Sequence, residues 1–528
     1  MGPPNAAEAK RLPPETATFY RCLGFEGGRR NNLVYVAPNI LIHTCGNSVQ
    51  FLDLVTKSQS NLPSVGGDGI GCVAVHPSKT FFAVCEKGNH PNVYIYNYPS
   101  LTTDKVLKLG TEKVYTAAAF NFDGSQLATV GGHPDYWLTV WDWTTESIVL
   151  QSKAFSQDVF QVSFSRHFSG QLVTSGIGHI RFWKMANTFT GPKLEGLIGK
   201  FGQVPLSDIC AFVELPDGKV LSGTETGTVL VWDGGLIKCQ LRRPGGLPCH
   251  NGMIEFLQLD EKENEMLTAG ADGCVRFWSL QWLDAADDGD EKTVCEVNPL
   301  RELHVDDNCS IKGIIVSDDH WLIQDENGVL WKVHVPSFEV EKVLEFHAGF
   351  ITGLSVSPSN HFLATSGSDC SVRLFHFEKK QQVYARWFAS GATSILWPSK
   401  TVDPHYRTVI TGFADGVIRI LSKGTHQWRL IDAHKPHTMD VTALNYTVDG
   451  DLLATSSLDS TVFFFHSSNG YKPLGFIKAP GPVTCIDWSP NGLNLLLGCS
   501  NGKIMEIARP EWSLSRGRKV NQQAVVHP

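Results

Sequence analysis

Short apolar segments separated by polar turns recur along the whole chain. VAVHPSKTFFAV (Val73–Val84), AAFNFDGSQLAT (Ala118–Thr129) and VTCIDWSPNGLNLLL (Val483–Leu497) each begin with apolar and polar residues in alternation. A turn rich in Pro, Asp, Asn or Gly follows, and then a nearly continuous apolar run. This order predicts a β-hairpin whose second strand is covered on both faces. No segment shows a sustained helical period, so we expect very little helix.

The pattern repeats with a period near 45 residues. Each unit has a third short strand that ends on an apolar or aromatic residue, and these residues are spaced by 42 to 55 positions. The equivalent positions are Leu52, Tyr96, Trp141, Trp183, Trp232, Trp278, Val333, Phe375, Leu421, Phe465 and Ile507. Four short strands per unit at this period are the signature of a WD40-type β-propeller. The sequence therefore predicts an all-β fold.

Eleven units exceed the four to eight blades of a typical propeller, so we predict two tandem propellers, the second incomplete. The expected divisions are a disordered N-terminus (1–17), a first propeller of seven units (18–341), a partial second propeller of about four blades (342–512) and a flexible tail (513–528). Residues Thr18–Val36 are expected to supply an outer strand that closes the first ring. A partial second ring is expected to expose an apolar blade face.

Three units carry polar residues at matching positions. The clearest set is His250, Thr268, Asp272 and Trp278. The others are His347, Thr365, Asp369 and Phe375, and His434, Thr455, Asp459 and Phe465. We predict a buried structural tetrad in which Asp accepts from His, His bonds the Thr hydroxyl, and Thr bonds the indole N–H of Trp. Phe in place of Trp removes that last bond while keeping the ring's packing.

A hydrolase triad or a metal site could also use His, Asp and Thr. A catalytic set would occur once, whereas this one recurs and degrades together with the repeat, which favours a structural role. The sequence contains no His-Glu-x-x-His or Gly-x-Ser-x-Gly spacing. We therefore predict no catalytic residues, no metal ligands and no cofactor.

Composition narrows the class of partner. The formal net charge is −8, with 45 Lys and Arg against 53 Asp and Glu, so bulk charge gives no reason to expect nucleic-acid binding. The N-terminal residues lack a signal peptide, and no apolar run is long enough for a membrane span. Thirteen cysteines without a Cys-x-x-Cys pair suggest reduced thiols in a cytosolic compartment.

Three other segments have a plain interpretation. Gly66–Gly71 (GGDGIG) resembles a phosphate-binding loop but leads into a strand, so a turn between units is expected. The acidic run Asp284–Glu291 lies in the longest interval and lacks the spacing of a calcium loop, so we expect a solvated insertion. The C-terminal segment from Ala508 onward carries the basic residues Arg509, Arg516, Arg518 and Lys519, which could contact an acidic surface or belong to an untethered tail.

Several longer segments, including DGIGCVAVHPSKTFFAVCEKG, SGIGHIRFWKMANTFTGPKLEGLIGKFG, ELPDGKVLSG and TAGADGCVRFW, resemble the family of cilia- and flagella-associated protein 44 from about Phe19 to Ile507. The resemblance implies a non-enzymatic scaffold of the axoneme in motile cilia and flagella. It also implies a role in the tether between inner-arm dynein motor heads and doublet microtubules, with cilia- and flagella-associated protein 43 as a partner. Family members continue into long coiled-coil regions, and this chain contains no sustained heptad pattern.

Two other functions are compatible with a propeller. One is a cytosolic adaptor for protein-complex assembly or for the microtubule lattice. The other is an enzyme with a site in the central channel, which the absence of a recognisable constellation of reactive residues disfavours.

Overall fold

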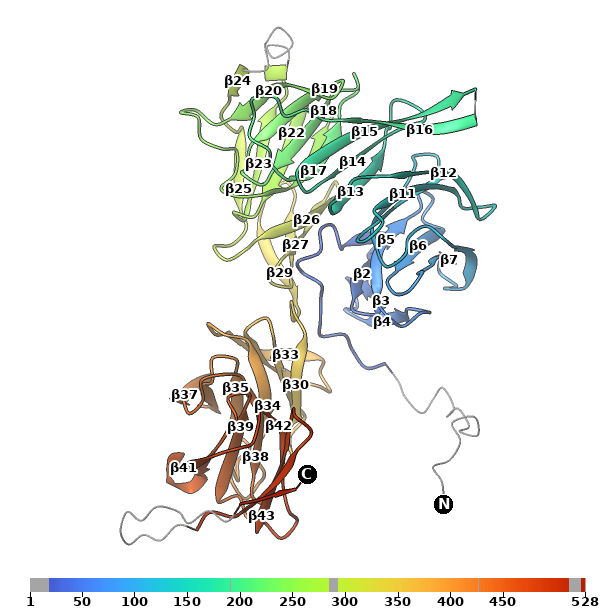
Figure 1. Ribbon diagram of the computed structural model, residues 1–528. Helices are drawn as coiled ribbons and strands as arrows, with labels where there is room; N and C mark the ends of the chain where they lie inside the picture. The colour runs from blue at the N-terminus through green and yellow to red at the C-terminus, as the bar shows by residue number, and fades with distance from the viewer. Residues whose placement is uncertain (1–18, 190, 284–292, 426, 512–523, 528) are drawn as a thin grey trace, which may run out of the picture. The chain divides into compact units, whose positions relative to one another are not determined.

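The computed structural model describes residues 19–189, 191–283, 293–425, 427–511 and 524–527. These residues form short strands joined by turns, with one 3-10 helical turn, Ser467–Asn469. The chain divides into two compact units between Phe346 and His347 (Figure 1). The predicted boundary after Glu341 is five residues early, because β29 (Val340–Glu345) crosses that position as the fourth strand of a sheet in the first unit.

The described strands form eleven sheets, ten of them with four antiparallel strands. All eleven positions of the sequence repeat fall on the third strand of a sheet, which confirms the predicted period and the propeller fold. Trp278, for example, lies opposite Met266 on the second strand of its sheet. The second strands are almost wholly buried, as expected for strands covered by sheets on both faces.

The first unit contains seven sheets. In each sheet the strand named first lines the centre; the first sheet contains β1 (Val34–Ala37), β2 (Ile40–Cys45), β3 (Ser48–Asp53) and β4 (Gln59–Pro63), the second contains β5 (Ile70–Val75), β6 (Phe81–Glu86), β7 (Val93–Asn97) and β8 (Thr103–Leu107), and the third contains β9 (Tyr115–Phe120), β10 (Leu127–Gly131), β11 (Trp137–Asp142) and β12 (Ser147–Lys153). The fourth sheet contains β13 (Val159–Phe164), β14 (Gln171–Gly176), β15 (His179–Thr188) and β16 (Gly191–Ile198), and the fifth contains β17 (Ile209–Glu214), β18 (Val220–Thr224), β19 (Val229–Asp233), β20 (Leu236–Arg242) and β24 (Thr293–Glu296). The sixth sheet contains β21 (Ile254–Asp260), β22 (Glu265–Gly270), β23 (Cys274–Ser279) and β25 (Arg301–His304), and the seventh contains β26 (Ile311–Val316), β27 (His320–Asp325), β28 (Val329–His334) and β29.

The second unit contains four sheets. Their strands are β30 (Ile351–Val356), β31 (Phe362–Gly367), β32 (Ser371–His376) and β33 (Gln381–Trp387); β34 (Ala392–Leu396), β35 (Thr408–Phe413), β36 (Ile418–Lys423) and β37 (Trp428–His434); β38 (Val441–Tyr446), β39 (Leu452–Ser457), β40 (Thr461–His466) and β41 (Lys472–Lys478); and β42 (Val483–Trp488), β43 (Asn494–Cys499), β44 (Ile504–Ala508) and β45 (Ala524–His527).

The first unit is a closed ring of seven blades. Seven clusters of buried apolar side chains each join two adjacent sheets, so every sheet packs on both neighbours. The cluster that closes the ring joins Leu41 and Leu52 of the first sheet to Leu322 and Leu330 of the seventh, with Phe25 and Phe346 at its edge. Burial of apolar surface between blades therefore provides the main stabilisation of the disc.

The predicted outer closing strand from Thr18–Val36 is wrong. Val34 begins β1, the innermost strand of the first sheet, and β29 already occupies the outer position of the seventh sheet. Because that edge is paired, the N-terminal segment has no outer position left to fill. The ring closes instead through side-chain packing and through polar contacts of residues 26–32, which are described below.

The long interval before Val333 has a structural explanation. After β23 the chain first adds β24 as a fifth strand, parallel to β20, on the neighbouring fifth sheet. It then returns as β25, which completes the sixth sheet next to β23. The acidic run Asp284–Glu291 lies outside the described residues.

The second unit is an open array in the part of the chain that the structure describes. Three apolar clusters join its four sheets in sequence, so the first and the last sheet each keep one face without a neighbouring blade in the unit. Leu354 and Val356 on β30 are 59% and 50% exposed, and Leu496 and Ile504 on the last sheet are 45% and 54% exposed. These apolar side chains lie where the incomplete ring was predicted to expose them.

The prediction of a flexible tail over 513–528 is wrong for Ala524–His527. These residues form β45, which pairs antiparallel with β44 and completes the last sheet. The outer edge of β44 presents unpaired backbone groups, and an extended segment with consecutive valines satisfies them. Arg509, just before the undescribed residues, binds Asp449 at 2.6 Å. Arg516, Arg518 and Lys519 lie outside the described residues.

Candidate functional site

The sixth blade brings together the four residues of the predicted tetrad. The Nδ1 of His250 is 2.8 Å from Asp272 Oδ1, and its Nε2 is 2.8 Å from Thr268 Oγ1. The indole Nε1 of Trp278 donates to the same hydroxyl at 2.8 Å. A single proton arrangement satisfies all three bonds: Trp278 donates to Thr268, Thr268 donates to His250 Nε2, and His250 Nδ1–H donates to Asp272.

This network lies inside the blade and leaves no room for a substrate. The side chains of His250, Thr268 and Trp278 are fully buried, so the hydroxyl that a triad would use as a nucleophile is closed off. Burial lowers the pKa of His250, which favours the neutral ring that the bonding pattern requires. Burial alone would raise the pKa of Asp272, but hydrogen bonds from His250 and Arg276 hold it well below its usual range.

An arginine completes the network and was missed in the sequence. Arg276 Nη1 donates to Asp272 Oδ2 at 2.8 Å, and its Nε donates to Glu302 at 2.7 Å. The ninth blade repeats the pair, with Arg419 bound to Asp415 at 2.8 Å. The sequence contains the signal: Arg276 and Arg419 each follow the turn Asp by four positions and precede the third-strand position of the repeat, Trp278 or Leu421, by two. The tetrad is thus a pentad in the sixth blade, whereas the ninth blade keeps the Asp–Arg pair and its Thr411 hydroxyl has no hydrogen-bond partner among the described residues.

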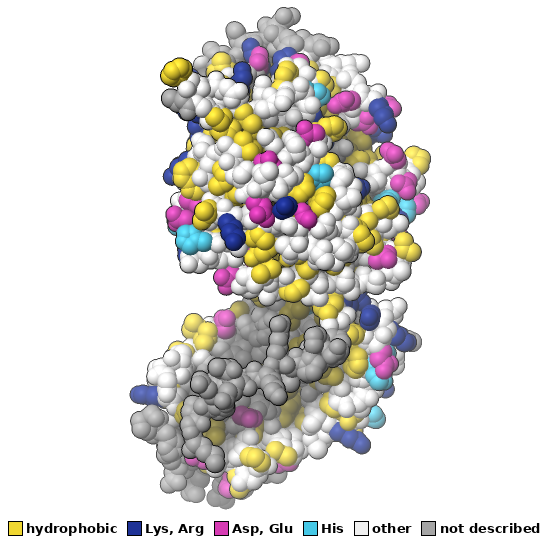
Figure 2. Space-filling model, turned by 90° about the vertical axis from the view of Figure 1, so that its right-hand side faces the viewer, with side chains coloured by type: hydrophobic (Ala, Val, Ile, Leu, Met, Phe, Trp, Pro, Cys, Tyr) yellow, Lys and Arg dark blue, Asp and Glu magenta, His cyan; other side chains and the backbone are white. Residues whose placement is uncertain are grey.

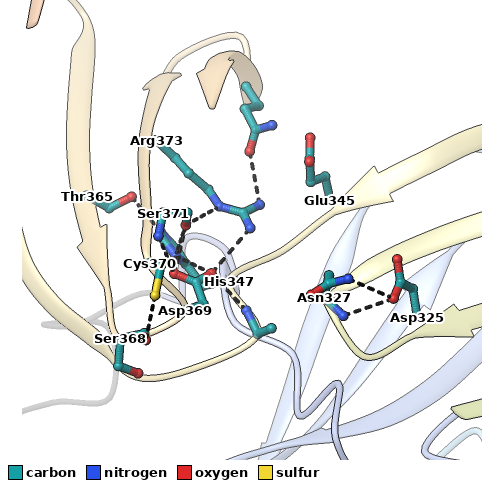
Figure 3. A network of polar contacts seen from close by, with 12 residues as sticks. Asp325, Asn327, Glu345, His347, Thr365, Ser368, Asp369, Cys370, Ser371 and Arg373 are labelled. Carbon is teal, nitrogen blue, oxygen red and sulfur yellow. Dashed lines mark hydrogen bonds and ion pairs between the residues drawn. The ribbon is translucent and has the colours of Figure 1, made fainter. Parts of the chain in front are cut away.

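The eighth blade has the same arrangement with Phe in the Trp position, and Figure 3 shows His347, Thr365, Asp369 and Arg373 of this network. His347 Nε2 is 2.8 Å from Thr365 Oγ1, and His347 Nδ1 is 3.1 Å from Asp369 Oδ2. Phe375 packs in the indole position and is nearly buried. Arg373, also buried, lies 3.3 Å from Asp369 Oδ2. Burial would raise the pKa of Asp369, but the bond from His347 and the other polar contacts lower it to about 2.

In the tenth blade the predicted histidine is wrong. Thr455 and Thr461 hold His437 rather than His434: His437 Nε2 is 2.9 Å from Thr455 Oγ1, and Nδ1 is 2.8 Å from Thr461 Oγ1, which in turn donates to Asp459. His434 is the last residue of β37, where it pairs with Asp432 at 3.1 Å and its ring lies 5.6 Å from that of Phe465. The histidine precedes the threonine by 18 residues in all three networks, and His434 is three positions too early for that spacing.

This correction gives a direct prediction. His437→Ala removes a buried ring and leaves the Thr455 hydroxyl without its partner, so the free energy of unfolding of the second unit is expected to fall by about 2–3 kcal/mol. His434→Ala removes a side chain at the end of an outer strand and is expected to cost less than about 1 kcal/mol. Urea unfolding of the two variants measures the difference. Equal losses, or a larger loss for His434→Ala, would show that the assignment of the tenth blade is wrong.

Three further blades keep only part of the network. The indoles of Trp141, Trp183 and Trp232 donate to Thr129, Thr174 and Ser222 at 2.8–2.9 Å. Within the described residues, none of these three blades combines a turn aspartate with a histidine in the way that the sixth blade combines Asp272 with His250. The hydrogen bond from indole to hydroxyl is therefore the part of the network that most blades of the first unit share.

Residues 26–32 cross one end of the axial channel of the first unit. Arg30 binds the fully buried carboxylate of Glu255 on β21, and its guanidinium lies 4.1 Å from the ring centroid of Phe160 on β13. Lys312 Nζ on β26 is 2.7 Å from the same carboxylate. Gln324 on β27 donates to the carbonyl oxygens of Gly27 and Arg29. This plug, residues 26–32, links the inner strands of several blades.

Two hollows flank the channel. One, of about 230 Å³, lies against the plug and is bounded by Arg29, Arg30 and the first halves of β5, β9 and β13. The other, of about 320 Å³, lies at the opposite ends of β13, β17 and β21 and is lined by Phe164, Glu214 and Phe256 with Arg166 and His167 at its rim. None of the plug residues lines the second hollow.

The ring-closing cluster contains a buried titratable group. His43 lies between Phe25 and Phe346, with ring centroids 4.9 and 5.7 Å away. Its Nε2 has no protein partner, and Nδ1 is 3.5 Å from the carbonyl of Thr44. Burial lowers the pKa of His43 to about 4. Protonation of this ring would place a charge in an apolar junction, so the folded ring strongly favours the neutral form.

The lowered pKa of His43 predicts that the stability of the first ring depends on pH. Because the folded pKa of His43 is below the unfolded value of about 6.5, this contribution to stability is complete above pH 6.5 and is lost as the pH falls toward 4. The loss by pH 4 is expected to reach about 3 kcal/mol. His43→Leu is expected to flatten this part of the stability profile, measured by urea unfolding at several pH values. The other buried histidines remain in the variant as an internal reference. An unchanged slope in His43→Leu would contradict the assignment.

The remaining sequence motifs are structural. The backbone amides of Val65 and Gly66, in the Gly-rich loop, donate to the carboxylate of Glu86 within the same unit, so this loop holds an internal anion. Among the described residues, no three His, Cys, Asp or Glu side chains gather as a metal-binding group. No described helix is long and apolar enough to span a membrane. On the face shown in Figure 2, charged side chains of both signs are interspersed over the described surface of each unit.

Family models match both units. The model for the first β-propeller of echinoderm microtubule-associated proteins matches residues 67–309, and the WD domain, G-beta repeat model matches residues 338–376, 428–466 and 471–505. These matches cover a large part of the first ring and three of the four sheets of the second unit.

Curated relatives extend the similarity over almost the whole chain. Cilia- and flagella-associated protein 44 of Mus musculus is 43% identical over 96% of this chain, and that of Chlamydomonas reinhardtii is 39% identical over 95%. Echinoderm microtubule-associated protein-like 4 of Xenopus laevis is 26% identical over 96% of the chain. The chain spans 29% and 31% of the length of the first two relatives. The chain is therefore a WD-repeat β-propeller protein that is similar, over almost its whole length, to part of cilia- and flagella-associated protein 44.

Proposed function

We propose that this chain is a non-enzymatic scaffold of the axoneme in motile cilia and flagella. In this role it forms part of a tether that links inner-arm dynein motor heads to doublet microtubules, with cilia- and flagella-associated protein 43 as a partner. The observation that carries the proposal is the similarity to cilia- and flagella-associated protein 44 over 96% of the chain, with 43% identity. The consequence for the cell is support of ciliary or sperm flagellar motility.

The geometry supports a holding role. The polar groups that resemble catalytic or metal-binding sets bond to one another inside the blades, so they stabilise the disc rather than act on a substrate. What the disc presents to partners is its rim, its two faces and the hollow lined by Phe164, Glu214 and Phe256. A rigid disc of this kind suits the docking of several proteins at once.

Proximity labelling in ciliated cells tests this proposal. The tagged chain is expected to enter axonemes and to label inner-arm dynein and doublet microtubule proteins. Trp278→Ala, which weakens the sixth blade, is expected to reduce the labelling, and Trp137→Ala, which alters an exposed indole on β11, is expected to preserve it. Absence of the unaltered chain from axonemes would overturn the proposal.

A second function is favoured by a different observation. The first ring matches the first propeller of echinoderm microtubule-associated proteins, so the chain could act as a cytosolic adaptor that binds the microtubule lattice directly. Co-sedimentation with purified microtubules at increasing salt separates the two functions. Binding to bare lattice without recovery of dynein components from cells would favour the adaptor.

A further inference from the structure

Two cysteines lie side by side where the N-terminal segment meets the first blade. Cys22 precedes the plug, and Cys45 ends β2. The two thiols are hydrogen bonded to each other, and Cys22 Sγ also donates to the carbonyl of Gly24 at 3.2 Å. A Cβ atom on Gly24 would lie 3.0 Å from Cys45 Sγ, so the glycine leaves the space in which the second sulfur sits.

We infer that Cys22 and Cys45 form a reversible disulfide when the protein meets a peroxide, and that this bond fastens the plug segment to the first blade. Both side chains are half-buried rather than enclosed, so a small oxidant can reach them. The segment between them contains Phe25, which belongs to the ring-closing cluster, and Glu26, which accepts from the amide of Gly46 at 3.0 Å. A covalent bond here would therefore secure the closure of the ring.

The chemistry balances with hydrogen peroxide as the oxidant. The Cys22 thiolate attacks one peroxide oxygen, the O–O bond breaks, and the departing hydroxide takes a proton to become water. The resulting sulfenic acid is attacked by the sulfur of Cys45, the S–O bond breaks, and the second hydroxide leaves as water with the Cys45 proton. Two thiols lose two electrons in total, and one peroxide is reduced to two waters.

Cys22 is assigned as the attacking residue by its surroundings. The hydrogen bond from Cys45, together with the charge of Arg21, lowers the pKa of Cys22, while the pKa of Cys45 is raised. The thiolate is the reactive form of cysteine, so the first oxidation is expected on Cys22. Cys45 then acts as the resolving thiol.

A second pair provides a matched control within the same chain. Cys72 and Cys85 lie directly opposite each other on β5 and β6, and their thiols are also hydrogen bonded. Both are buried between the second and third blades, at 8% and 0% exposure. Proximity without access is expected to leave this pair reduced. The lone exposed thiol of Cys485 reports whether peroxide has reached the protein at all.

Mass spectrometry of the full chain tests the inference. Trypsin separates all four cysteines, because Arg29, Arg30, Lys57 and Lys79 lie between them. After treatment with hydrogen peroxide and alkylation, a linked pair of the peptides 22–29 and 31–57 is expected, with Cys72 and Cys85 alkylated separately. The inference is overturned if Cys485 is oxidised while Cys22 and Cys45 stay singly alkylated or proceed only to sulfinic acid.

Thermal unfolding gives the structural readout. Oxidation is expected to raise the Tm of the first ring by on the order of 5 °C, because the bond constrains the unfolded chain between the two cysteines. A reductant is expected to reverse the shift, and Cys22→Ser and Cys45→Ser are each expected to abolish it. If either variant folds poorly, the reversible formation of the linked peptide pair in the unaltered chain still tests the inference. A linked peptide with no change in Tm would show that the bond does not fasten the ring.

Discussion

Trp278→Ala is expected to lower the free energy of unfolding of the first ring by about 3–5 kcal/mol. The indole is fully buried in the cluster between the fifth and sixth blades, so its removal leaves a cavity beside residues that cannot collapse onto it. It also deprives the Thr268 hydroxyl of a donor. Urea unfolding followed by circular dichroism measures the loss.

Trp137→Ala is the matched control for this substitution. Trp137 is the same residue type at the start of β11 in the same ring, and its side chain is 37% exposed. Its replacement is expected to cost less than about 1 kcal/mol. If the two substitutions cost the same, the stability of the ring does not depend on the interior of the sixth blade.

The second large effect is expected at the plug. Glu255→Ala removes the carboxylate that holds Arg30 and Lys312, and it leaves one cation of the plug and one of β26 without their shared partner. Breaking a buried ion pair by removal of one member costs about 3–5 kcal/mol, because the remaining charge stays desolvated. The first ring is therefore expected to unfold at markedly lower urea concentration, and hydrogen exchange is expected to accelerate in residues 26–32.

An exposed ion pair in the same ring serves as the control. Asp233 lies 3.6 Å from Lys238, and both side chains are about half exposed. Asp233→Ala is expected to change stability by less than about 1 kcal/mol, since solvent screens such pairs. Equal effects of Glu255→Ala and Asp233→Ala would contradict the role of the plug in closing the ring.

The fold could be predicted from the sequence because the repeat is local. Hairpins with a period-two strand, a polar turn and an apolar strand are encoded within about twenty residues, and the third-strand positions from Leu52 to Ile507 all fall where the period places them. The polar residues of the sixth and eighth blades follow the same period. In the tenth blade the same 18-residue spacing before Thr455 indicates His437, so the prediction of His434 is wrong.

Other features depend on contacts that no local pattern records. Arg30 and Glu255 are separated by 225 positions, so their contact forms only when the ring closes, and no local pattern in the sequence predicts it. The parallel strand β24 pairs with the free edge of β20 after the chain leaves β23, and no spacing in the sequence predicts this pairing. The fourth strand of the last sheet, β45, likewise follows from an open edge on β44 rather than from the repeat.

The central claim is that the recurring polar side chains brace the blades by bonding to one another. A double-mutant cycle on Thr268→Val and Trp278→Phe measures this most directly, because each substitution removes one partner of a 2.8 Å bond while largely preserving shape. We predict a coupling of about 1 kcal/mol in the free energy of unfolding, with each single variant clearly destabilised. Strictly additive effects, or single variants as stable as the unaltered chain, would contradict the claim.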